Sequence, residues 1–258
     1  MKKESKDGLD KLSGFVNIKN NLRIFLCGGA ELQVDELNKT FASEVLKSPS
    51  KTLLYIPIAH PEIVAKGIVY THYAMYDVVK AYFLKFGLKR VEMWRDLAGK
   101  SFNDLKRFGG VYIGGGYEFK LLYDLKRSGF DKILRRYIDN GKPVYGSSAG
   151  ALVLGKDIRT GYMCIETPGE DKVIGLKSFA GLNKVDNCII SVHYKRSFDK
   201  EIFNLAKKLR SRILALPFKA GAYLLNGKLY IVTDTDPAYL FDSKNKVKLE
   251  NGIVKSLK

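Results

Sequence analysis

Short apolar runs alternate with amphipathic stretches along the N-terminal part of the chain. Apolar runs bounded by glycine, proline or charged residues are typical of buried strands, and apolar positions three or four apart indicate helices. The predicted strands are residues 22–27, 52–57, 91–94, 110–113 and 143–145. The predicted helices are residues 34–46, 73–86 and 119–138, with a break in the last near Gly129. This alternation predicts a parallel sheet joined by right-handed crossovers.

The hydrophobic pattern changes after residue 155. Residues 156–185 contain glycine, proline and many charged residues, and predict a loop or a short hairpin. The elements predicted beyond them are a strand at 188–192, a helix at 198–209, a strand at 213–216, a hairpin at 223–232, and strands at 238–241 and 246–249. No repeat or linker interrupts the pattern. We therefore expect a flexible arm at residues 1–20 and one α/β domain over residues 21–258, with a β-rich C-terminal tail.

Composition argues against several classes of protein. The chain of 258 residues carries 44 Lys and Arg against 27 Asp and Glu, a formal net charge of +17. The basic residues are dispersed and no nucleic-acid motif accompanies them, so we expect a solvated basic surface and no nucleic-acid partner. No apolar run approaches the roughly 18 residues of a membrane span, and no signal peptide is expected. Three scattered cysteines predict neither a disulfide framework nor a metal site, which favours the cytoplasm.

The stretch from Val144 to Ala151 carries the clearest chemical signal, because an apolar strand, a sharp turn and a helix start follow one another. Gly146 and Gly150 flank Ser148 in a G-x-S-x-G pattern, which is typical of a nucleophile elbow. Small neighbours let the strand and the helix approach, so that the hydroxyl projects clear of the sheet. Free N–H groups and the positive dipole end of the helix favour an oxyanion beside it. Ser148 is the predicted nucleophile.

A serine nucleophile needs a base, and the chain contains three histidines. Residues that follow the carboxyl ends of parallel strands gather at one edge of the sheet. Ser148 and His193 both occupy such positions, and His193 is the predicted base. His60 also follows a predicted strand and stays an alternative pocket residue, whereas His72 lies in or before a helix.

An oxyanion hole needs backbone N–H groups aimed at one point. Ala149, directly after the nucleophile, supplies one such donor in elbow enzymes. The glycine triplet at residues 114–116 ends a neighbouring predicted strand and can bring a second donor close. The alternative is a phosphate-binding turn, but the triplet lacks the G-x-G-x-x-G and G-K-[ST] spacings.

Spacing does not identify the acidic partner of the histidine. The acidic residues between Ser148 and His193 are Asp157, Glu166, Glu170, Asp171 and Asp186. Most acidic residues are solvated surface charges, so the residues alone leave this choice open.

Three motifs together carry a family resemblance: Gly-Gly-Gly at 114–116, Gly-Ser-Ser-Ala-Gly-Ala at 146–151, and Val-His-Tyr at 192–194. They resemble the peptidase E (aspartyl dipeptidase) family of serine peptidases, which includes cyanophycinase, over about residues 22–240. The resemblance implies a three-layer α/β sandwich around a mainly parallel sheet, like the class I glutamine amidotransferases, and neither cofactor nor metal. It also implies matched roles: nucleophile Ser148, base His193, and oxyanion donors Gly116 and Ala149.

The resemblance also bears on the acid. Cyanophycinase has a glutamate eighteen residues past the serine, and that position here is Glu166. Peptidase E has an aspartate fifteen residues past it, where this chain has Met163. The resemblance therefore implies Glu166, with Glu170 and Asp171 as alternatives.

The chain departs from the family pattern where substrate preference is set. Tyr117 replaces an asparagine after the glycine triplet, Ser147 replaces a tryptophan before the nucleophile, and only Arg196 and Lys200 lie near the position of a substrate-binding arginine. We therefore expect a weak or altered preference for an N-terminal aspartate. The sequence His-Pro-Glu at 60–62 copies a glutamine amidotransferase motif, but it precedes the elbow and is interpreted as accidental.

These patterns predict a serine peptidase, monomeric or homodimeric, that hydrolyses small peptides through an acyl-enzyme on Ser148. One alternative is an esterase-type α/β hydrolase, which shares the chain order serine, acid, histidine. Its histidine usually falls near the end of the domain, whereas several predicted elements follow His193 here. The other alternative, a non-catalytic amidotransferase-like binding protein, does not need the Ser148–His193 pair.

Overall fold

The computed structural model of the chain describes residues 19–59, 63–65, 68–70, 72–164 and 175–254. Most of the predicted N-terminal arm lies outside these ranges. So do four residues considered for the site, namely His60, Glu166, Glu170 and Asp171. Within the described ranges, no helix has the length and apolar character needed to cross a membrane.

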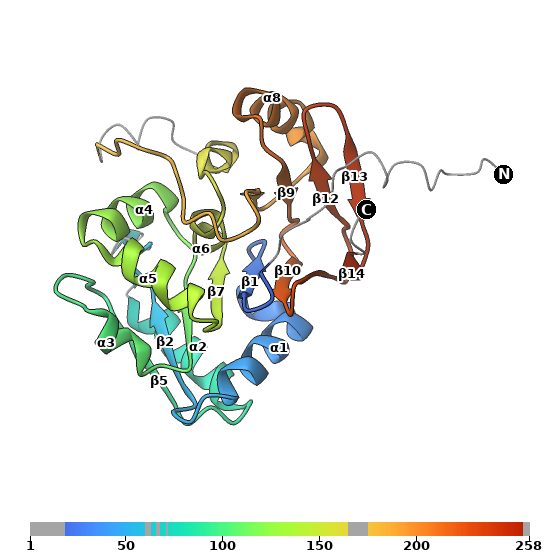
Figure 1. Cartoon of the computed structure of the whole chain (residues 1–258). Coiled ribbons are helices and arrows are strands. Elements are labelled where there is room, and N and C mark those ends of the chain that lie inside the picture. The colour runs from blue at the N-terminus through green and yellow to red at the C-terminus, as the bar shows by residue number, and fades with distance from the viewer. Residues whose placement is uncertain (1–18, 60–62, 66–67, 71, 165–174, 255–258) are drawn as a thin grey trace.

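In the described part of the chain, an eight-stranded sheet forms the centre of the molecule (Figure 1). Its strands, from edge to edge, are β5 (Arg90–Met93), β2 (Thr52–Ile56), β6 (Gly110–Ile113), β7 (Val144–Ser147), β1 (Arg23–Cys27), β10 (Ala220–Leu225), β11 (Lys228–Thr233) and β14 (Gly252–Val254). The strands from β5 to β1 are parallel, and those from β1 to β14 pair antiparallel. The predicted mainly parallel sheet is confirmed, and part of the C-terminal region extends it.

Helices cover both faces of the central sheet and give three layers (Figure 1). Side chains alternate along each strand, so that in β1 Ile24 and Leu26 face one side while Phe25 and Cys27 face the other. The face of the sheet that carries the Ile24 side chain is covered by α3 (Phe102–Lys106), α4 (Glu118–Arg127), α5 (Phe130–Asp139) and α6 (Ala149–Leu154). The opposite side is covered by α1 (Asp35–Leu46) and α2 (His72–Leu84).

Local sequence signals set the ends of several elements. Gly129 has a φ of 71° and separates α4 from α5 at the predicted break. Asn226 and Gly227 have φ values of 52° and 73°, which suit the tight turn between the antiparallel strands β10 and β11. Several short elements were not predicted, among them β3 (Ile63–Ala65), β4 (Ile68–Tyr70), α3 and β14, because segments of three to five residues are too short to show periodicity.

A second sheet carries the segment that leads to His193. Its strands, four within the described residues, are β13 (Lys246–Leu249), β12 (Ala238–Phe241), β9 (Ile213–Ala215) and β8 (Ile189–Ser191). The helix α8 (Asp199–Leu209) packs on one face, and Figure 1 shows it beside β9 and β12. The other face adds Ile190, Leu214 and Leu240 to the core around α6.

The expectation that the strand before His193 ends at the edge of the central parallel sheet is wrong. This strand, β8, pairs with β9 in the second sheet. A short buried apolar run shows that a strand is present, but it does not show which strand lies beside it. His193 therefore approaches the central sheet from a separate element.

Candidate active site

Ser148 lies on the turn between β7 and α6, in a backbone conformation that is rare for serine. Its φ is 48° and its ψ is −111°, and such conformations cost about 1–3 kcal/mol. The N–H of Ser148 donates to the carbonyl of Cys27 at the end of β1, at 3.0 Å. The surrounding sheet thus holds the serine in the strained geometry of a nucleophile elbow.

The two glycines of the elbow allow the strand and the helix to approach. A Cβ atom on Gly146 would overlap the carbonyl of Gly150, and a Cβ atom on Gly150 would overlap the carbonyl of Ile113 in the neighbouring strand β6. Both obstacles are backbone atoms, which cannot rotate away. This explains in physical terms why the pattern around Ser148 needs glycine on both sides.

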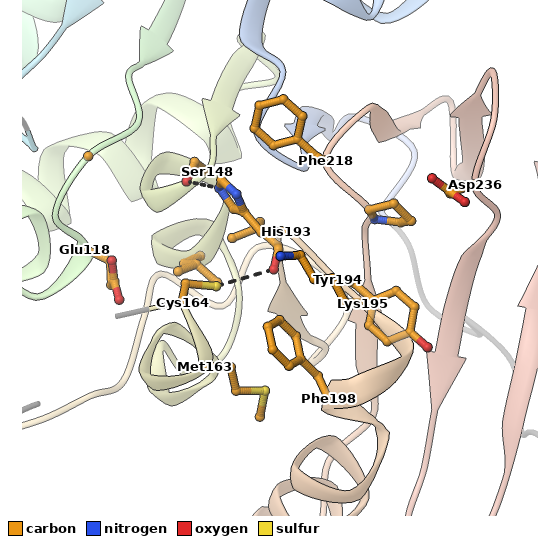
Figure 2. A pocket seen from close by; sticks show the side chains of 14 residues that line it. Glu118, Ser148, Met163, Cys164, His193, Tyr194, Lys195, Phe198, Phe218 and Asp236 are labelled. Carbon is orange, nitrogen blue, oxygen red and sulfur yellow. Dashed lines mark hydrogen bonds between the residues drawn. The ribbon is translucent and has the colours of Figure 1, made fainter. Parts of the chain in front are cut away.

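His193 reaches the serine from the second sheet. Its Nε2 atom lies 2.9 Å from Oγ of Ser148, within hydrogen-bond distance (Figure 2). His193 has a φ of 50°, and its N–H donates to the carbonyl of Gly28 at 3.0 Å. The consecutive carbonyls of Cys27 and Gly28 therefore accept the backbone N–H groups of Ser148 and His193, respectively.

A slot formed by Gly29 and Phe218 holds the imidazole ring. The rings of His193 and Phe218 have their centroids 5.3 Å apart. A Cβ atom on Gly29 would lie 2.8 Å from Cε1 of His193 and 2.6 Å from the Phe218 ring. The absence of a side chain at Gly29 thus leaves room for both rings.

The environment of His193 favours the neutral imidazole. Burial lowers the pKa of His193, and the positive charge of Lys195 lowers this pKa further. A neutral ring has a free lone pair on one nitrogen, which can accept the proton of the Ser148 hydroxyl. The pair is therefore suited to proton transfer at neutral pH.

One predicted oxyanion donor, Ala149, directly follows the serine in the chain, and the other, Gly116, lies in the lining of the pocket that contains it. Gly116 lines the same pocket as Ser148 and has a φ of 125°. The N–H of Gly114 donates to the carbonyl of Ile56, which keeps the end of β6 paired with β2. Ala149 is the first residue of α6, where an N–H group has no acceptor within the helix. The role of both donors stays a prediction.

A pocket of about 750 Å³ surrounds the Ser148–His193 pair. Its lining residues include three charged side chains, Glu118, Lys195 and Asp236, together with the apolar Met163 and Phe198 (Figure 2). The other residues of the lining are Gly116, Leu152, Cys164, Val192, Tyr194, Pro217 and Phe218. Among the residues described, no group of three or more His, Cys, Asp or Glu side chains is placed to hold a metal ion.

Two of the acidic residues considered as the partner of His193 are engaged elsewhere. Asp157 accepts two bonds from the Arg159 guanidinium, at 2.9 and 2.8 Å. Asp186 pairs with Arg212 at 3.0 Å. The remaining three candidates lie between residues 165 and 174, outside the described part of the chain. The acidic partner thus stays a prediction.

The residues expected to set substrate preference do not line this pocket. Ser147 is fully buried one residue before the nucleophile, and Tyr117 packs against Phe119 with ring centroids 5.9 Å apart. Arg196 and Lys200 are also absent from the lining. Sequence reasoning instead missed the charged residues that do line it. Among them, Glu118 could have been predicted to lie in the pocket, because it is two residues past the glycine triplet that contains a predicted oxyanion donor.

Comparison with known proteins identifies the class of this molecule as a peptidase. The family model "Peptidase family S51" matches residues 24–234, so the chain belongs to peptidase family S51. An uncharacterized peptidase of Listeria innocua is 28% identical over 206 residues, which cover 78% of this chain and 86% of that protein. Peptidase E of Shewanella sp. (strain ANA-3) is 37% identical over 81 residues, 31% of each chain. The resemblance to peptidase E is thereby confirmed.

Solved structures share the fold. A putative peptidase E of Listeria monocytogenes EGD-e superimposes with a TM-score of 0.62 at 24% identity, covering 83% of this chain and all of that one. A peptidase from an acI-B1 Actinobacterium gives a TM-score of 0.63 at 16% identity, covering 90% of this chain and 96% of that one. At these identities the comparison establishes the architecture alone.

Proposed function

We propose that the protein is a serine peptidase that hydrolyses short peptides through an acyl-enzyme on Ser148. The observation that carries this proposal is the 2.9 Å contact between Oγ of Ser148 and Nε2 of His193 at a strained elbow. Membership of a peptidase family supports the peptide bond as the substrate linkage. The pocket of about 750 Å³ lies within the roughly 300–1,000 Å³ typical of small-ligand sites.

The proposed reaction begins when Oγ of Ser148 attacks the peptide carbonyl while His193 takes its proton. The N–H groups of Gly116 and Ala149 stabilise the negative charge that forms on the carbonyl oxygen. The intermediate collapses as His193 donates the proton to the leaving amine, which leaves the acyl-enzyme. A water molecule, deprotonated by His193, then releases the acid and regenerates Ser148.

We assign the acidic partner of His193 to Glu166 on the family resemblance, with Glu170 and Asp171 as alternatives. A carboxylate there fixes the ring tautomer and stabilises the imidazolium formed during attack. The proposal includes small peptides as partners, a monomeric or homodimeric enzyme, and a cytoplasmic location. It requires no metal or organic cofactor.

Labelling with a fluorophosphonate probe tests the proposal. We expect one probe per chain on Ser148, and a loss of peptide hydrolysis by several orders of magnitude in Ser148→Ala. Ser147→Ala is the matched control, since Ser147 is buried and lies outside the pocket lining. Persisting turnover in Ser148→Ala contradicts the serine mechanism. The same assay on Glu166→Gln, Glu170→Gln and Asp171→Asn identifies the acid as the variant with the large loss of rate.

A further inference from the structure

A hydrogen-bonded network holds the residue that directly follows the proposed base. Tyr194 lines the pocket next to His193, and only 6% of its surface is exposed. Its hydroxyl donates to Oδ1 of Asp199 at 2.6 Å, and Nζ of Lys246 donates to Oδ2 of the same carboxylate at 2.6 Å. Asp199 and Lys246 are the first residues of α8 and β13. The network therefore connects the segment after β8 to two other elements, and the proposed mechanism gives it no role.

Aromatic rings surround the ammonium group of Lys246. Its Nζ atom lies 4.2 Å from the ring centroid of Tyr239, 5.4 Å from that of Phe241 and 5.5 Å from that of Tyr194. An ammonium group near the face of an aromatic ring is attracted by the ring quadrupole. The Tyr194 ring also packs against the other two, with centroid distances of 5.4 and 6.0 Å. These contacts hold Lys246, and with it the Asp199 carboxylate, beside the Tyr194 hydroxyl.

The backbone at this point is fixed from two sheets. The N–H of His193 donates to the carbonyl of Gly28, which follows β1 in the central sheet. The N–H of Tyr194 donates to the carbonyl of Leu216, which follows β9 in the second sheet, at 3.0 Å. Two consecutive residues thus bridge the sheets, and the Tyr194 hydroxyl adds a further attachment to the second sheet.

The Tyr194 hydroxyl stays protonated at neutral pH and is therefore a steady hydrogen-bond donor. Burial, followed by the hydrogen bond to Asp199, raises the pKa of Tyr194. A hydrogen bond to a carboxylate is about twice as strong as one between neutral groups. Figure 2 shows the hydroxyl turned away from Ser148, so it is not placed to touch the reacting atoms. Any effect of this hydroxyl on catalysis must act through the position of His193.

We propose that Tyr194 is a positioning residue, which holds His193 at the distance from Ser148 that proton transfer needs through its hydrogen bond to the Asp199–Lys246 pair. This inference rests on the proposed function and adds a residue to it. A displacement of a reacting group by about 1 Å can lower a rate on the order of 100-fold. An attachment one residue from the base is therefore able to control the rate without touching substrate.

The first test is steady-state kinetics of the wild type, Tyr194→Phe, Asp199→Ala and Asp199→Asn. The substrate is the aminoacyl p-nitroanilide that the wild type cleaves fastest, from a panel with acidic, neutral and basic residues. Tyr137→Phe is the matched control, because the Tyr137 hydroxyl is also buried and donates to the carbonyl of Phe108 at 2.9 Å, but lies outside the pocket lining. Circular dichroism shows whether each variant is folded at the assay temperature.

The second test needs no turnover. In ¹⁵N-labelled protein, the chemical shift of Nε2 of His193 reports its hydrogen bond to Oγ of Ser148. The signal is assigned by its loss in His193→Ala, and Ser148→Ala gives the shift without the bond. We expect the shift in Tyr194→Phe to move toward the Ser148→Ala value, whereas Tyr137→Phe should keep the wild-type shift.

We expect Tyr194→Phe to lower kcat at least about tenfold and to change KM less than about twofold, because the lost bond acts on the base and not on substrate binding. Asp199→Ala should have the same effect. Asp199→Asn keeps an acceptor oxygen and should retain part of the rate that Asp199→Ala loses. Tyr137→Phe should lower stability and leave kcat unchanged.

Two results in Tyr194→Phe overturn the inference. One is a kcat and an Nε2 shift that both equal those of the wild type. The other is a raised KM at unchanged kcat, because Tyr194 would then bind substrate. Absence of all hydrolysis by the wild type contradicts the proposed function, and the Nε2 shift then decides the inference by itself.

Discussion

At the scale of single residues, the site is built from uncommon backbone conformations. Ser148 and His193 have backbone φ values of 48° and 50°, which residues other than glycine seldom adopt. Each N–H is held by a carbonyl at 3.0 Å, so hydrogen bonds within the fold compensate for the strain. Strain at two interacting polar residues is typical of functional sites, which agrees with the roles proposed for them.

The charge of Lys195 leads to a prediction about pH dependence. Lys195 and burial both disfavour the imidazolium, so the pKa of His193 is lowered, and the neutral base persists to lower pH. In Lys195→Met this pKa should rise, which moves the acidic limb of the kcat/KM profile to higher pH. The shift should be small, because Lys195 is exposed and burial remains.

The control for this prediction is Lys200→Met, since Lys200 is exposed but does not line the pocket. Its profile should match that of the wild type. If the acidic limb of the kcat/KM profile stays in place or moves to lower pH in Lys195→Met, a group other than His193 governs the pH dependence.

At the scale of elements, the loop after β1 and the loop between β9 and β10 together orient the ring of His193, the proposed base. Gly29→Ala adds a Cβ atom that would lie 2.8 Å from Cε1 of His193. We expect kcat to fall by on the order of 100-fold, because small displacements of a catalytic group have such effects. Steady-state kinetics should show this loss in kcat, while circular dichroism shows an intact fold.

Two further variants distinguish displacement of the His193 ring from a general loss of stability. Gly99→Ala places a Cβ atom in open space at a position with a φ of 69°, so it should lower stability slightly and leave the rate unchanged. Phe218→Ala combined with Gly29→Ala gives the displaced side chains room and should restore part of the lost rate. If kcat does not recover in the double variant, the space between Gly29 and Phe218 does not determine the position of the His193 ring.

The elements differ in how far the sequence could predict them. Long amphipathic stretches and apolar runs located the longer helices and every strand of the central sheet except β14, and the strand, turn and helix around Ser148 follow the predicted pattern. The partner of β8 could not be predicted, because its short apolar run carries no information about pairing. The charged pocket residue Asp236 could not be placed either, because no site motif lies near it in the sequence and only the folded chain brings its segment to the pocket.

At the scale of the whole molecule, the two halves of the Ser148–His193 pair belong to different sheets. Ser148 follows β7 in the central sheet, whereas His193 follows β8 in the second sheet. The second sheet has its own core with α8, which includes Phe241. Activity therefore depends on how the two sheets pack as well as on the stability of each.

Loosening the second sheet should inactivate the protein before it unfolds. Phe241 is fully buried, with its ring 5.2 Å from that of Phe203, and Phe241→Ala should cost about 3–5 kcal/mol locally. We expect urea to abolish activity in this variant at a lower concentration than it abolishes the far-ultraviolet circular dichroism signal. Local opening of one unit below the global transition accounts for this separation.

The control is Phe83→Ala, which removes an equally buried ring between α2 and the opposite face of the central sheet. In this variant the two urea transitions should coincide. Coincident transitions in Phe241→Ala as well would show that the two sheets unfold as one cooperative unit.

The consecutive carbonyls of Cys27 and Gly28 have a consequence for sequence divergence. They accept hydrogen bonds from the backbone N–H groups of Ser148 and His193, and every residue type that could replace Cys27 or Gly28 keeps its backbone carbonyl. Replacement of Cys27 therefore leaves this acceptor in place, whereas at Gly28 a side chain would collide with the carbonyl of Pro217. One peptide unit thus sets the spacing of the two backbone segments that carry Ser148 and His193, and substitutions that spare the glycines around it leave that spacing unchanged.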